Sequence, residues 1–166
     1  MYFTKIDNED YDLIKDYKWH ANKQGNTYYA RAYIPKSLRK TNRKSLLMHR
    51  IIMNAPNHLQ VDHIDHNGLN NKKENLRLCT HQENRMNSLK QKNNTTGYKG
   101  VEYCQDKNRT KPYRACIYFD SKHISLKYFP TAIEAAIAYD KKALELFGEF
   151  ALLNFPDIIA PTQVTE

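Results

Sequence analysis

The chain has 166 residues, enough for one ordinary domain or two small ones. Its 26 Lys and Arg residues exceed its 18 Asp and Glu residues, a balance that favours a polyanionic partner. No apolar run approaches the roughly 20 residues of a membrane span, and the acidic opening is unlike a signal peptide, so we expect a cytoplasmic protein without a membrane partner.

A short helix is predicted near the start of the chain. Asp7 is a suitable residue to precede it, because an Asp carboxylate can accept hydrogen bonds from the first main-chain N–H groups of a helix. The apolar side of this helix is expected to consist of Tyr11, Ile14 and Tyr17.

Residues 28–56 are expected to supply a strand, a loop and a buried segment. YYARAYI, residues 28–34, alternates as a strand does, and PKSLRKTNRK, residues 35–44, has the composition of a basic loop. SLLMHRIIM, residues 45–53, is apolar around a His-Arg step. It predicts a buried strand or helix that stops at Pro56.

Residues 60–89 predict a strand, a long loop, a second strand and a helix. QVDHID alternates, HNGLNNKKEN has the composition of a turn, and LRLCT alternates again. Alternation places Asp62 and His63 on opposite sides of the first strand unless a bend or bulge follows. Thr80 and Glu83 form a capping box, which predicts a helix from His81 to about residue 89.

The rest of the chain predicts a linker at residues 90–96 and then a second module. Three alternating runs, YKGVEYC, YRACIYF and HISLKYF, predict a small antiparallel sheet. Thr131 and Glu134 form another capping box, and Gly148 should end the helix that follows. The apolar stripe of this helix is expected to consist of Ile133, Ala136, Ile137, Ala143, Leu144 and Phe147.

The predicted fold class is therefore α+β, with four segments along the chain. Residues 1–89 hold the N-terminal segment and the strand-loop-strand-helix module, and residues 90–96 form the linker. Residues 97–156 hold the three-stranded sheet with its helix, and residues 157–166 form a tail. The odd, widely spaced cysteines, expected to be small buried fillers, are Cys79, Cys104 and Cys116.

The first module carries residue types suited to phosphodiester hydrolysis. Asp62 and Asn84 can give oxygen ligands to a divalent cation such as Mg²⁺, which also takes phosphate oxygens. A neutral His63 can take a proton from water and act as a general base. Asn75 can either hold the loop through bonds to the main chain or orient the imidazole.

Residues 46–89 resemble the HNH homing endonucleases, in the variant whose last histidine is replaced by asparagine. The matching motifs are MHRIIM, VDHIDHNGLNN, ENLRLCT and HQEN. The resemblance implies a ββα-metal module in which Asp62 and Asn84 bind the metal, His63 is the general base and Asn75 is the middle residue of the motif. The amide of Asn84 favours Mg²⁺ or Mn²⁺ over Zn²⁺, because an amide oxygen is a hard, weak ligand.

Residues 97–156 resemble the AP2/ERF DNA-binding domain. The motifs are TGYKGV, YRACIYF and the segment from LKYFPTAIEAAIAYD to LNFP. The resemblance implies that the sheet enters the major groove of DNA. The strand positions that could then face DNA are Lys99, Tyr103, Tyr113, Arg114, His123, Ser125 and Lys127.

Further contacts with DNA phosphates are expected from the basic stretch between residues 31 and 50. Its candidates are Arg31, Arg39, Arg43 and Arg50. A contact of Arg50 with the scissile phosphate is a minority hypothesis, since the apolar segment around it favours a core role for His49. His66 and His81 are expected to meet solvent or phosphate and to replace an assigned ligand only if the register differs.

These features together predict a metal-dependent endonuclease that acts on double-stranded DNA, of the homing type and from a phage or mobile element. The alternatives are a DNA-binding regulator with a degenerate nuclease module and, less favoured, an RNA-directed nuclease, because side chains cannot read the deep major groove of RNA. A single metal site per chain makes one nick per binding event the simpler expectation. The oligomeric state stays open, with a monomer preferred.

Overall fold

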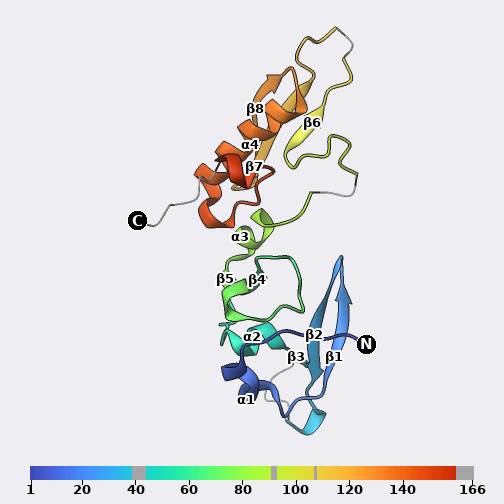
Figure 1. The fold of residues 1–166 in the computed structure, drawn as a ribbon, viewed down its shortest axis with the longest axis vertical. Helices are drawn as coiled ribbons and strands as arrows, with labels where there is room; N and C mark the ends of the chain where they lie inside the picture. The colour runs from blue at the N-terminus through green and yellow to red at the C-terminus, as the bar shows by residue number, and fades with distance from the viewer. Residues whose placement is uncertain (39–43, 91–92, 107, 160–166) are drawn as a thin grey trace. The chain divides into compact units, whose positions relative to one another are not determined.

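The computed structural model describes residues 1–38, 44–90, 93–106 and 108–159 (Figure 1). The chain divides into two compact units, Met1–Asn84 and Arg85–Glu166. The boundary falls inside a helix that precedes the segment predicted as a linker. Each unit has its own apolar core and small antiparallel sheets, so each is considered by itself.

The first unit contains a sheet in the order β1-β2-β3. Its strands are β1 (Trp19–Gln24), β2 (Thr27–Tyr33) and β3 (Ser45–Leu47), all antiparallel. β2 confirms the predicted strand, and the short 3-10 helix η2 (Lys36–Leu38) lies in the basic loop that follows. β1 was not predicted, because WHANKQ lacks apolar alternation and becomes a strand through its pairing with β2.

The helical start of the chain is shorter than predicted. It consists of η1 (Asn8–Asp10) and α1 (Tyr11–Ile14), and the Asp7 side chain makes no capping bond. Asp7 instead accepts a hydrogen bond from the main-chain N–H of Lys73, at 2.8 Å. Of the three residues expected on the apolar side, Ile14 is buried while Tyr11 and Tyr17 are exposed, so that part of the prediction was wrong.

The apolar segment at residues 45–53 contains both of the structures considered for it. β3 ends at Leu47 and α2 (Met48–Ile52) begins at the next residue. Met48 and Ile52 then enter the core of the first unit. That core also contains Ile14, Ala30, Val61 and Leu76.

The strand-loop-strand-helix unit is present. β4 (Gln60–His63) pairs antiparallel with β5 (Leu76–Cys79), and α3 (His81–Met86) follows; η3 (Lys73–Asn75) closes the loop. The capping box is confirmed, because the N–H of Glu83 donates to the Thr80 hydroxyl at 3.2 Å and the Glu83 carboxylate accepts from the N–H of Thr80 at 2.6 Å. The helix ends three residues before the expected position.

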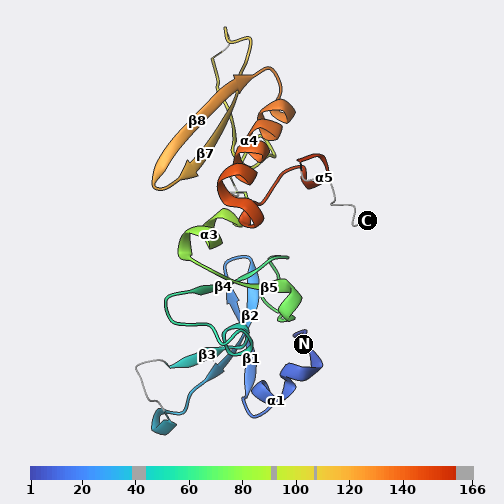
Figure 2. The same cartoon turned by 90° about the vertical axis from the view of Figure 1, so that its left-hand side faces the viewer.

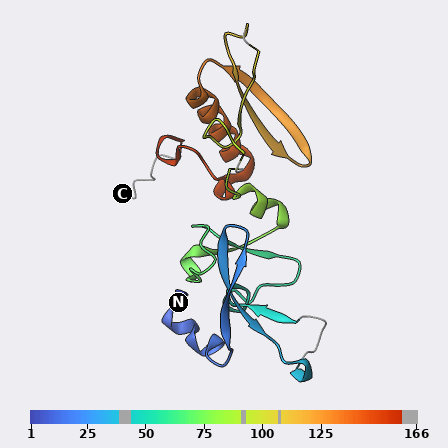
Figure 3. The same cartoon turned by 90° about the vertical axis from the view of Figure 1, so that its right-hand side faces the viewer.

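The second unit packs one helix on a three-stranded sheet, as predicted (Figure 2). The strands are β6 (Val101–Tyr103), β7 (Tyr113–Phe119) and β8 (Lys122–Phe129), antiparallel in this order. The helix is α4 (Ala132–Phe147), with the predicted capping box at its start and Gly148 at its end. Short helices η4 (Gly148–Phe150) and α5 (Pro156–Ile159) follow, as Figure 3 also shows.

The core of the second unit lies between α4 and the sheet. Ala115 and Ile117 of β7 meet Ala136, Tyr139, Ala143 and Phe147 of α4. Gly100 is required beside this helix, because a Cβ there would lie 1.9 Å from the Tyr139 ring. The predicted stripe was wrong for two of its members, since Ile133 and Leu144 are exposed.

A buried carboxylate ties the segment LNFP to the rest of the second unit. Asp140 of α4 accepts hydrogen bonds from the N–H of Asn154 and of Phe155 and from the Asn154 amide, at 2.8–2.9 Å. The Asn154 side chain in turn accepts from the N–H of Lys99 at 2.7 Å and donates to the Lys99 carbonyl at 3.1 Å. Asp140 therefore joins α4, the C-terminal segment and the approach to β6.

Among the helices of the described residues, none is long and apolar enough to cross a membrane.

Candidate functional site on the β4–β5 hairpin

Asp62 and His63 are consecutive residues of β4 with side chains on opposite faces. The register runs without a shift from Gln60 opposite Cys79 to His63 opposite Leu76, so the bulge considered for this strand is absent from it. β4 ends at His63, where the His66 N–H donates to the His63 carbonyl at 3.0 Å and turns the chain. Only 6% of Asp62 and 5% of His63 is exposed.

Asp62 forms an ion pair with Arg77, the residue opposite it on β5. Its Oδ2 lies 2.9 Å from Nε and 2.8 Å from an Nη of Arg77. Both side chains are largely buried, so water solvates the carboxylate poorly. The guanidinium compensates its charge instead. Arg77 was not identified from the sequence. Pairing the two strands of the predicted hairpin in register would have placed it opposite Asp62.

Asn84 reaches the face of the hairpin that carries Asp62. From α3, its Nδ2 donates to the Oε1 of Gln60 at 2.6 Å. Gln60 and Asp62 are two residues apart on β4 and therefore share a face. The two predicted metal ligands, distant in sequence, thus lie on the same side of the hairpin.

The donor set on this face suits a hard divalent cation. A carboxylate from Asp62 and an amide oxygen from Asn84 are ligands of the kind that Mg²⁺ and Mn²⁺ take, together with water and phosphate. No sulfur or imidazole ligand is assigned to this set. The residues therefore fit a divalent metal held partly by protein and partly by substrate.

His63 lies in an aromatic cluster on the opposite face. Its ring is 5.0 Å from that of His49 and 5.6 Å from that of Tyr29, in edge-to-face arrangements. Burial lowers the pKa of His63, an effect opposed by a hydrogen bond with Asn71 and by nearby carboxylates. Burial, the neighbouring His63 and Arg50 lower the pKa of His49 to about 3. Both imidazoles are therefore neutral at neutral pH.

Asn71 contacts the imidazole and was not identified from the sequence. Its Oδ1 lies 3.2 Å from Nε2 of His63, and its Nδ2 donates to the Thr4 hydroxyl at 2.8 Å. The Thr4 hydroxyl donates its own proton to the carbonyl of Leu69 at 2.9 Å, so it must accept from Asn71. Because Nδ2 of Asn71 is the donor to Thr4, the atom of this amide that faces His63 is Oδ1, which can only accept a hydrogen bond.

The hydrogen-bond order fixes the tautomer of His63. An acceptor opposite Nε2 requires the proton on that nitrogen, so the lone pair of the neutral ring is on Nδ1. Asn71 is completely buried and its main-chain N–H donates to the carbonyl of Lys5 at 2.8 Å. The imidazole is therefore oriented by a chain of bonds that begins at the N-terminal segment.

Asn75 holds the loop, the first of the two roles considered for it. Its Oδ1 accepts from the N–H of Asp65 at 3.0 Å, and its Nδ2 donates to the Asp65 carboxylate at 2.9 Å and to the Asn70 carbonyl at 2.8 Å. Asp65 also accepts from Asn70 and from the N–H of Asn67. The amide that meets the imidazole is that of Asn71.

Arg50 has a structural role in the first unit, and its contact with DNA stays a prediction. Its guanidinium donates to the carbonyls of Ala55, Pro56 and Leu59, at 2.8–3.1 Å. It therefore clamps the segment that leads into β4. Arg31 lies on β2 with its guanidinium 5.5 Å from the Tyr33 ring. Arg39 and Arg43 lie outside the described residues.

The predicted DNA-facing positions of the second unit fall into two groups. Arg114, on β7, alternates with residues that pack on α4 and therefore lies on the opposite face. The exposed residues of β8 on this same face are His123 and Ser125, opposite Tyr118 and Cys116, whereas a register shift places Lys127 opposite the buried Ala115. Glu102 of β6, opposite Arg114, also belongs to this face and was not anticipated.

The other three positions do not belong to that face. Tyr113 packs against the core beside α4, and the exposed Tyr103 lies 5.3 Å from it, ring to ring. Lys99 precedes β6 instead of lying on it, and its ammonium donates to the carbonyls of Met86 and Ser88. Burial lowers the Lys99 pKa to about 8, an effect opposed by Asp140.

Comparisons with known proteins agree on the nature of the first unit. Residues 47–86 match the family described as HNH endonuclease. The chain is 35% identical over 158 residues to a mimivirus protein named "Uncharacterized HNH endonuclease L560", a match that covers 92% of this chain and 74% of the relative. It is 31% identical over 96 residues to "Protein 3.8" of Escherichia phage T7, covering 58% of this chain and 76% of that protein.

A shorter match links the chain to a plant protein. Over 37 residues it is 51% identical to "Dehydration-responsive element-binding protein 2E" of Arabidopsis thaliana, which covers 22% of this chain and 15% of the plant protein. No solved structure matches.

Proposed function

The chain belongs to the HNH endonuclease family and is a DNA endonuclease, and from this premise we propose that the unit of β4, β5 and α3 hydrolyses phosphodiester bonds of duplex DNA. The observation that carries the proposal is the pair of consecutive residues, Asp62 and His63, at the end of β4, each with its own support. Arg77 balances Asp62 on one face and Asn71 orients His63 on the other.

His63 acts as the general base in this proposal. Burial keeps its pKa low, so the ring is neutral and able to accept a proton at neutral pH. Because the contact with Asn71 places the ring proton on Nε2, the attacking water gives its proton to Nδ1. Tyr29 and His49 limit the directions in which the ring can turn, which holds Nδ1 in place.

Asp62 and Asn84 are proposed to hold the divalent metal, Mg²⁺ or Mn²⁺. When bound, the metal supplies positive charge that polarises the scissile phosphate and steadies the leaving 3′ oxygen. Asp62 brings negative charge to the site, and its ion pair with Arg77 orients the carboxylate and limits how strongly it attracts a cation. Asn84 contributes a neutral oxygen, and its bond to Gln60 orients the amide.

Because Asp62 and His63 leave β4 on opposite faces, the scissile phosphate is proposed to lie at the end of the strand. β4 stops at His63, and the chain turns back at residues 64–66. At this end of the strand, the nonbridging oxygens of the phosphate can lie on the face that carries Asp62. The attacking water can lie on the face that carries His63. Of the bend and the bulge considered for the end of this strand, the turn after His63 corresponds to the bend.

The second unit is proposed to bind DNA through the face of its sheet that is turned away from α4. Arg114 supplies positive charge suited to phosphates, and the His123 imidazole supplies a hydrogen-bonding group suited to base edges. The name of the plant relative, an element-binding protein, supports a DNA-binding role. The resemblance of residues 97–156 to the AP2/ERF domain supports the same role. The viral relatives support a homing or other mobile-element endonuclease that acts in an infected host cell.

The experiment is cleavage of a randomised duplex library with Mg²⁺, with sequencing of the ends on both strands. We expect cleavage that disappears when Mg²⁺ is chelated and is abolished by His63→Ala, while duplex binding persists. His58→Ala is the matched control, because His58 is an exposed histidine in the loop before β4 with no assigned role, and it should leave cleavage unchanged. Undiminished cleavage by His63→Ala would remove the general base from this proposal, and binding without cleavage would favour a regulator.

A further inference from the structure

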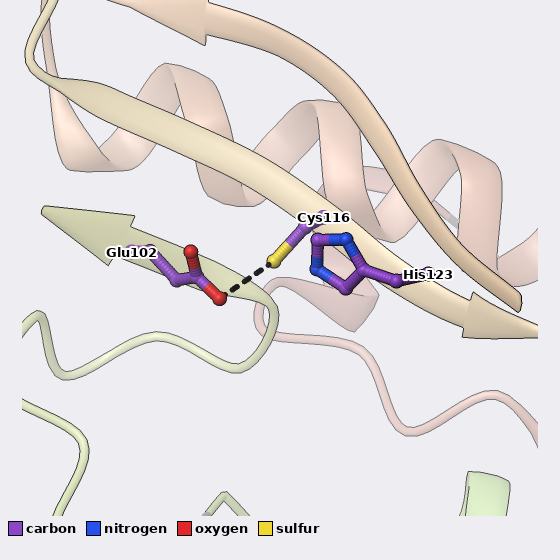
Figure 4. Close-up of side chains that lie close together, drawn as sticks. All are labelled: Glu102, Cys116 and His123. Atoms are coloured by element: carbon purple, nitrogen blue, oxygen red, sulfur yellow. Dashed lines mark hydrogen bonds between the residues drawn. The ribbon is translucent and has the colours of Figure 1, made fainter. Parts of the chain in front are cut away.

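Three side chains with metal-binding atoms converge on the sheet of the second unit, one from each strand. They are Glu102 of β6, Cys116 of β7 and His123 of β8, and Figure 4 shows them side by side. Their ligand atoms all lie within 4.8 Å of one another. Within the described residues, no other group of His, Cys, Asp and Glu side chains converges in this way.

The strand register explains why the three meet. Glu102 is opposite Arg114, two residues before Cys116, and His123 is opposite Tyr118, two residues after it. Residues two apart on a strand share a face, so Glu102 and His123 are the diagonal neighbours of Cys116 from either side. All three lie on the face turned away from α4.

The spacing is close to that of a tetrahedral metal centre. The Cys116 Sγ lies 3.3 Å from the Oε1 of Glu102. Bonds of about 2.3 Å to sulfur and about 2.0 Å to oxygen, at a tetrahedral angle, place those two atoms about 3.5 Å apart. The ligand nitrogen of His123 lies within 4.8 Å of both atoms, and because the ring is exposed, rotation about its side-chain bonds can adjust its position.

Two of the three residues also have an outer contact that orients them. Glu102 uses Oε2 for Arg114, whose Nε lies 3.2 Å away, and so presents Oε1 to Cys116. The Tyr118 ring meets the His123 ring edge to face at 4.9 Å. Ligand residues of metal sites have outer partners of this kind.

We propose that Glu102, Cys116 and His123 form a Zn²⁺ site separate from the hairpin of the nuclease. One sulfur, one imidazole nitrogen and one carboxylate oxygen are the ligand types that Zn²⁺ takes, whereas Mg²⁺ prefers oxygen alone. Three protein ligands leave the fourth position of the tetrahedron to water. When the metal binds, the Cys116 thiol loses its proton to solvent and the hydrogen bond from Sγ to Glu102 is replaced by two metal bonds.

Such a site links all three strands of a small sheet. β6 has only three residues and lies at the edge of the sheet, where it pairs with β7 alone. A metal bound by Glu102 and by residues of β7 and β8 holds that edge strand in place. Binding to the folded chain alone therefore stabilises the second unit, by an amount that grows with the logarithm of the free metal concentration above Kd.

The test is a titration of the full chain, stripped of metal and reduced with a phosphine, with Co²⁺ as a coloured probe for Zn²⁺. We expect one equivalent with thiolate-to-cobalt charge-transfer absorption and tetrahedral ligand-field bands, which Zn²⁺ then displaces. His123→Ala should weaken Zn²⁺ binding about tenfold or more, and because His123 is exposed this variant tests the site without endangering the core. Saturating Zn²⁺ should raise the thermal midpoint of the unsubstituted chain more than that of His123→Ala.

Matched cysteine variants locate the signal. Cys116→Ser should lose the charge-transfer band, while Cys79→Ser and Cys104→Ser should keep it. Absence of the band in the unsubstituted chain, its survival in Cys116→Ser, or equal Zn²⁺ affinity in His123→Ala would each overturn the proposal. Because none of these readouts uses DNA cleavage, their outcome is independent of the proposed nuclease site.

Discussion

The Oδ1 atom of Asn71 lies 3.2 Å from Nε2 of His63 and holds the ring proton on that nitrogen. This contact gives a buried amide, which is not itself a proposed metal ligand, control over which imidazole nitrogen is basic. It also connects the proposed base to Thr4 at the other end of the amide. The hairpin therefore depends on residues outside residues 47–86, the segment that matches the family.

Removing the Asn71 amide should slow cleavage and shift its pH dependence. We expect Asn71→Ala to lower kcat by about 100-fold or more, because the base loses its orientation. The hydrogen bond with Asn71 raises the pKa of His63, so its loss should move the acid limb of the pH profile to lower pH. Asn71→Asp should move that limb to higher pH, because a carboxylate stabilises the imidazolium.

Single-turnover cleavage across pH measures both effects. Thr4→Ser, which keeps the hydroxyl, serves as the conservative control and should behave as the unsubstituted chain, whereas Thr4→Val should resemble a mild form of Asn71→Ala. If the acid limb is unchanged in both Asn71 variants, Asn71 does not control the pKa of His63 and has only a packing role.

Arg77→Met should destabilise the first unit strongly. It leaves the largely buried carboxylate of Asp62 without its guanidinium, a loss worth about 3–5 kcal/mol of unfolding free energy. Lys15→Met is the matched control, because it removes an exposed ion pair with Asp12 and should cost about 1 kcal/mol or less. Urea unfolding followed by Trp19 fluorescence compares the two, and similar losses would contradict the burial argument.

Acid should destabilise the first unit through His49. Its folded pKa of about 3 lies below the ordinary 6.5, so the unfolded chain binds the proton more readily between these values. The stabilising contribution of neutral His49 is complete above pH 6.5, declines as the pH falls, and is lost at about pH 3. Each unit of pKa difference corresponds to about 1.4 kcal/mol.

His49→Gln should flatten this part of the stability curve. Unfolding free energies measured by urea at several pH values should fall less steeply for this variant than for the unsubstituted chain below pH 6.5. Parallel curves for His49→Gln and the unsubstituted chain would place the pH dependence elsewhere.

Asp140→Ala should detach the C-terminal segment from the second unit. The substitution leaves the N–H groups of Asn154 and Phe155 without their acceptor, and bonds to a charged group contribute about 1.5–3 kcal/mol each. We expect a loss of about 3 kcal/mol or more and fast hydrogen exchange at residues 154 and 155. Asp157→Ala, at an exposed position, should change neither quantity.

Alternation and capping predicted much of the fold. β2, β4, β5 and the strands of the second sheet follow period-two patterns, and both capping boxes start helices where Thr and Glu stand three residues apart. β1 lacks such a pattern because its pairing with β2, and not its own composition, makes it a strand. The errors at Ile133 and Leu144 arose because an apolar residue on a helix need not face the core.

The proposed site was predictable where it depends on neighbours in the sequence. Period two already separates Asp62 from His63, and the hairpin register places Arg77 opposite Asp62. Asn71 was not predictable, because its position follows from a parallel bridge between Lys5 and Asn70 that joins segments far apart in the chain. Glu102, Cys116 and His123 likewise meet only once the register of three strands is known.

The bond from Asn71 to Thr4 spans 67 residues of sequence and has a consequence for how the enzyme can be inactivated. Proteolytic trimming of the first five residues would remove the Thr4 hydroxyl and the Lys5 carbonyl together, while residues 47–86 stayed intact. The trimmed protein would keep every motif by which the family is identified and still lose the support of its base. The segment around Thr4 and Lys5 therefore supports the proposed base although it lies outside residues 47–86.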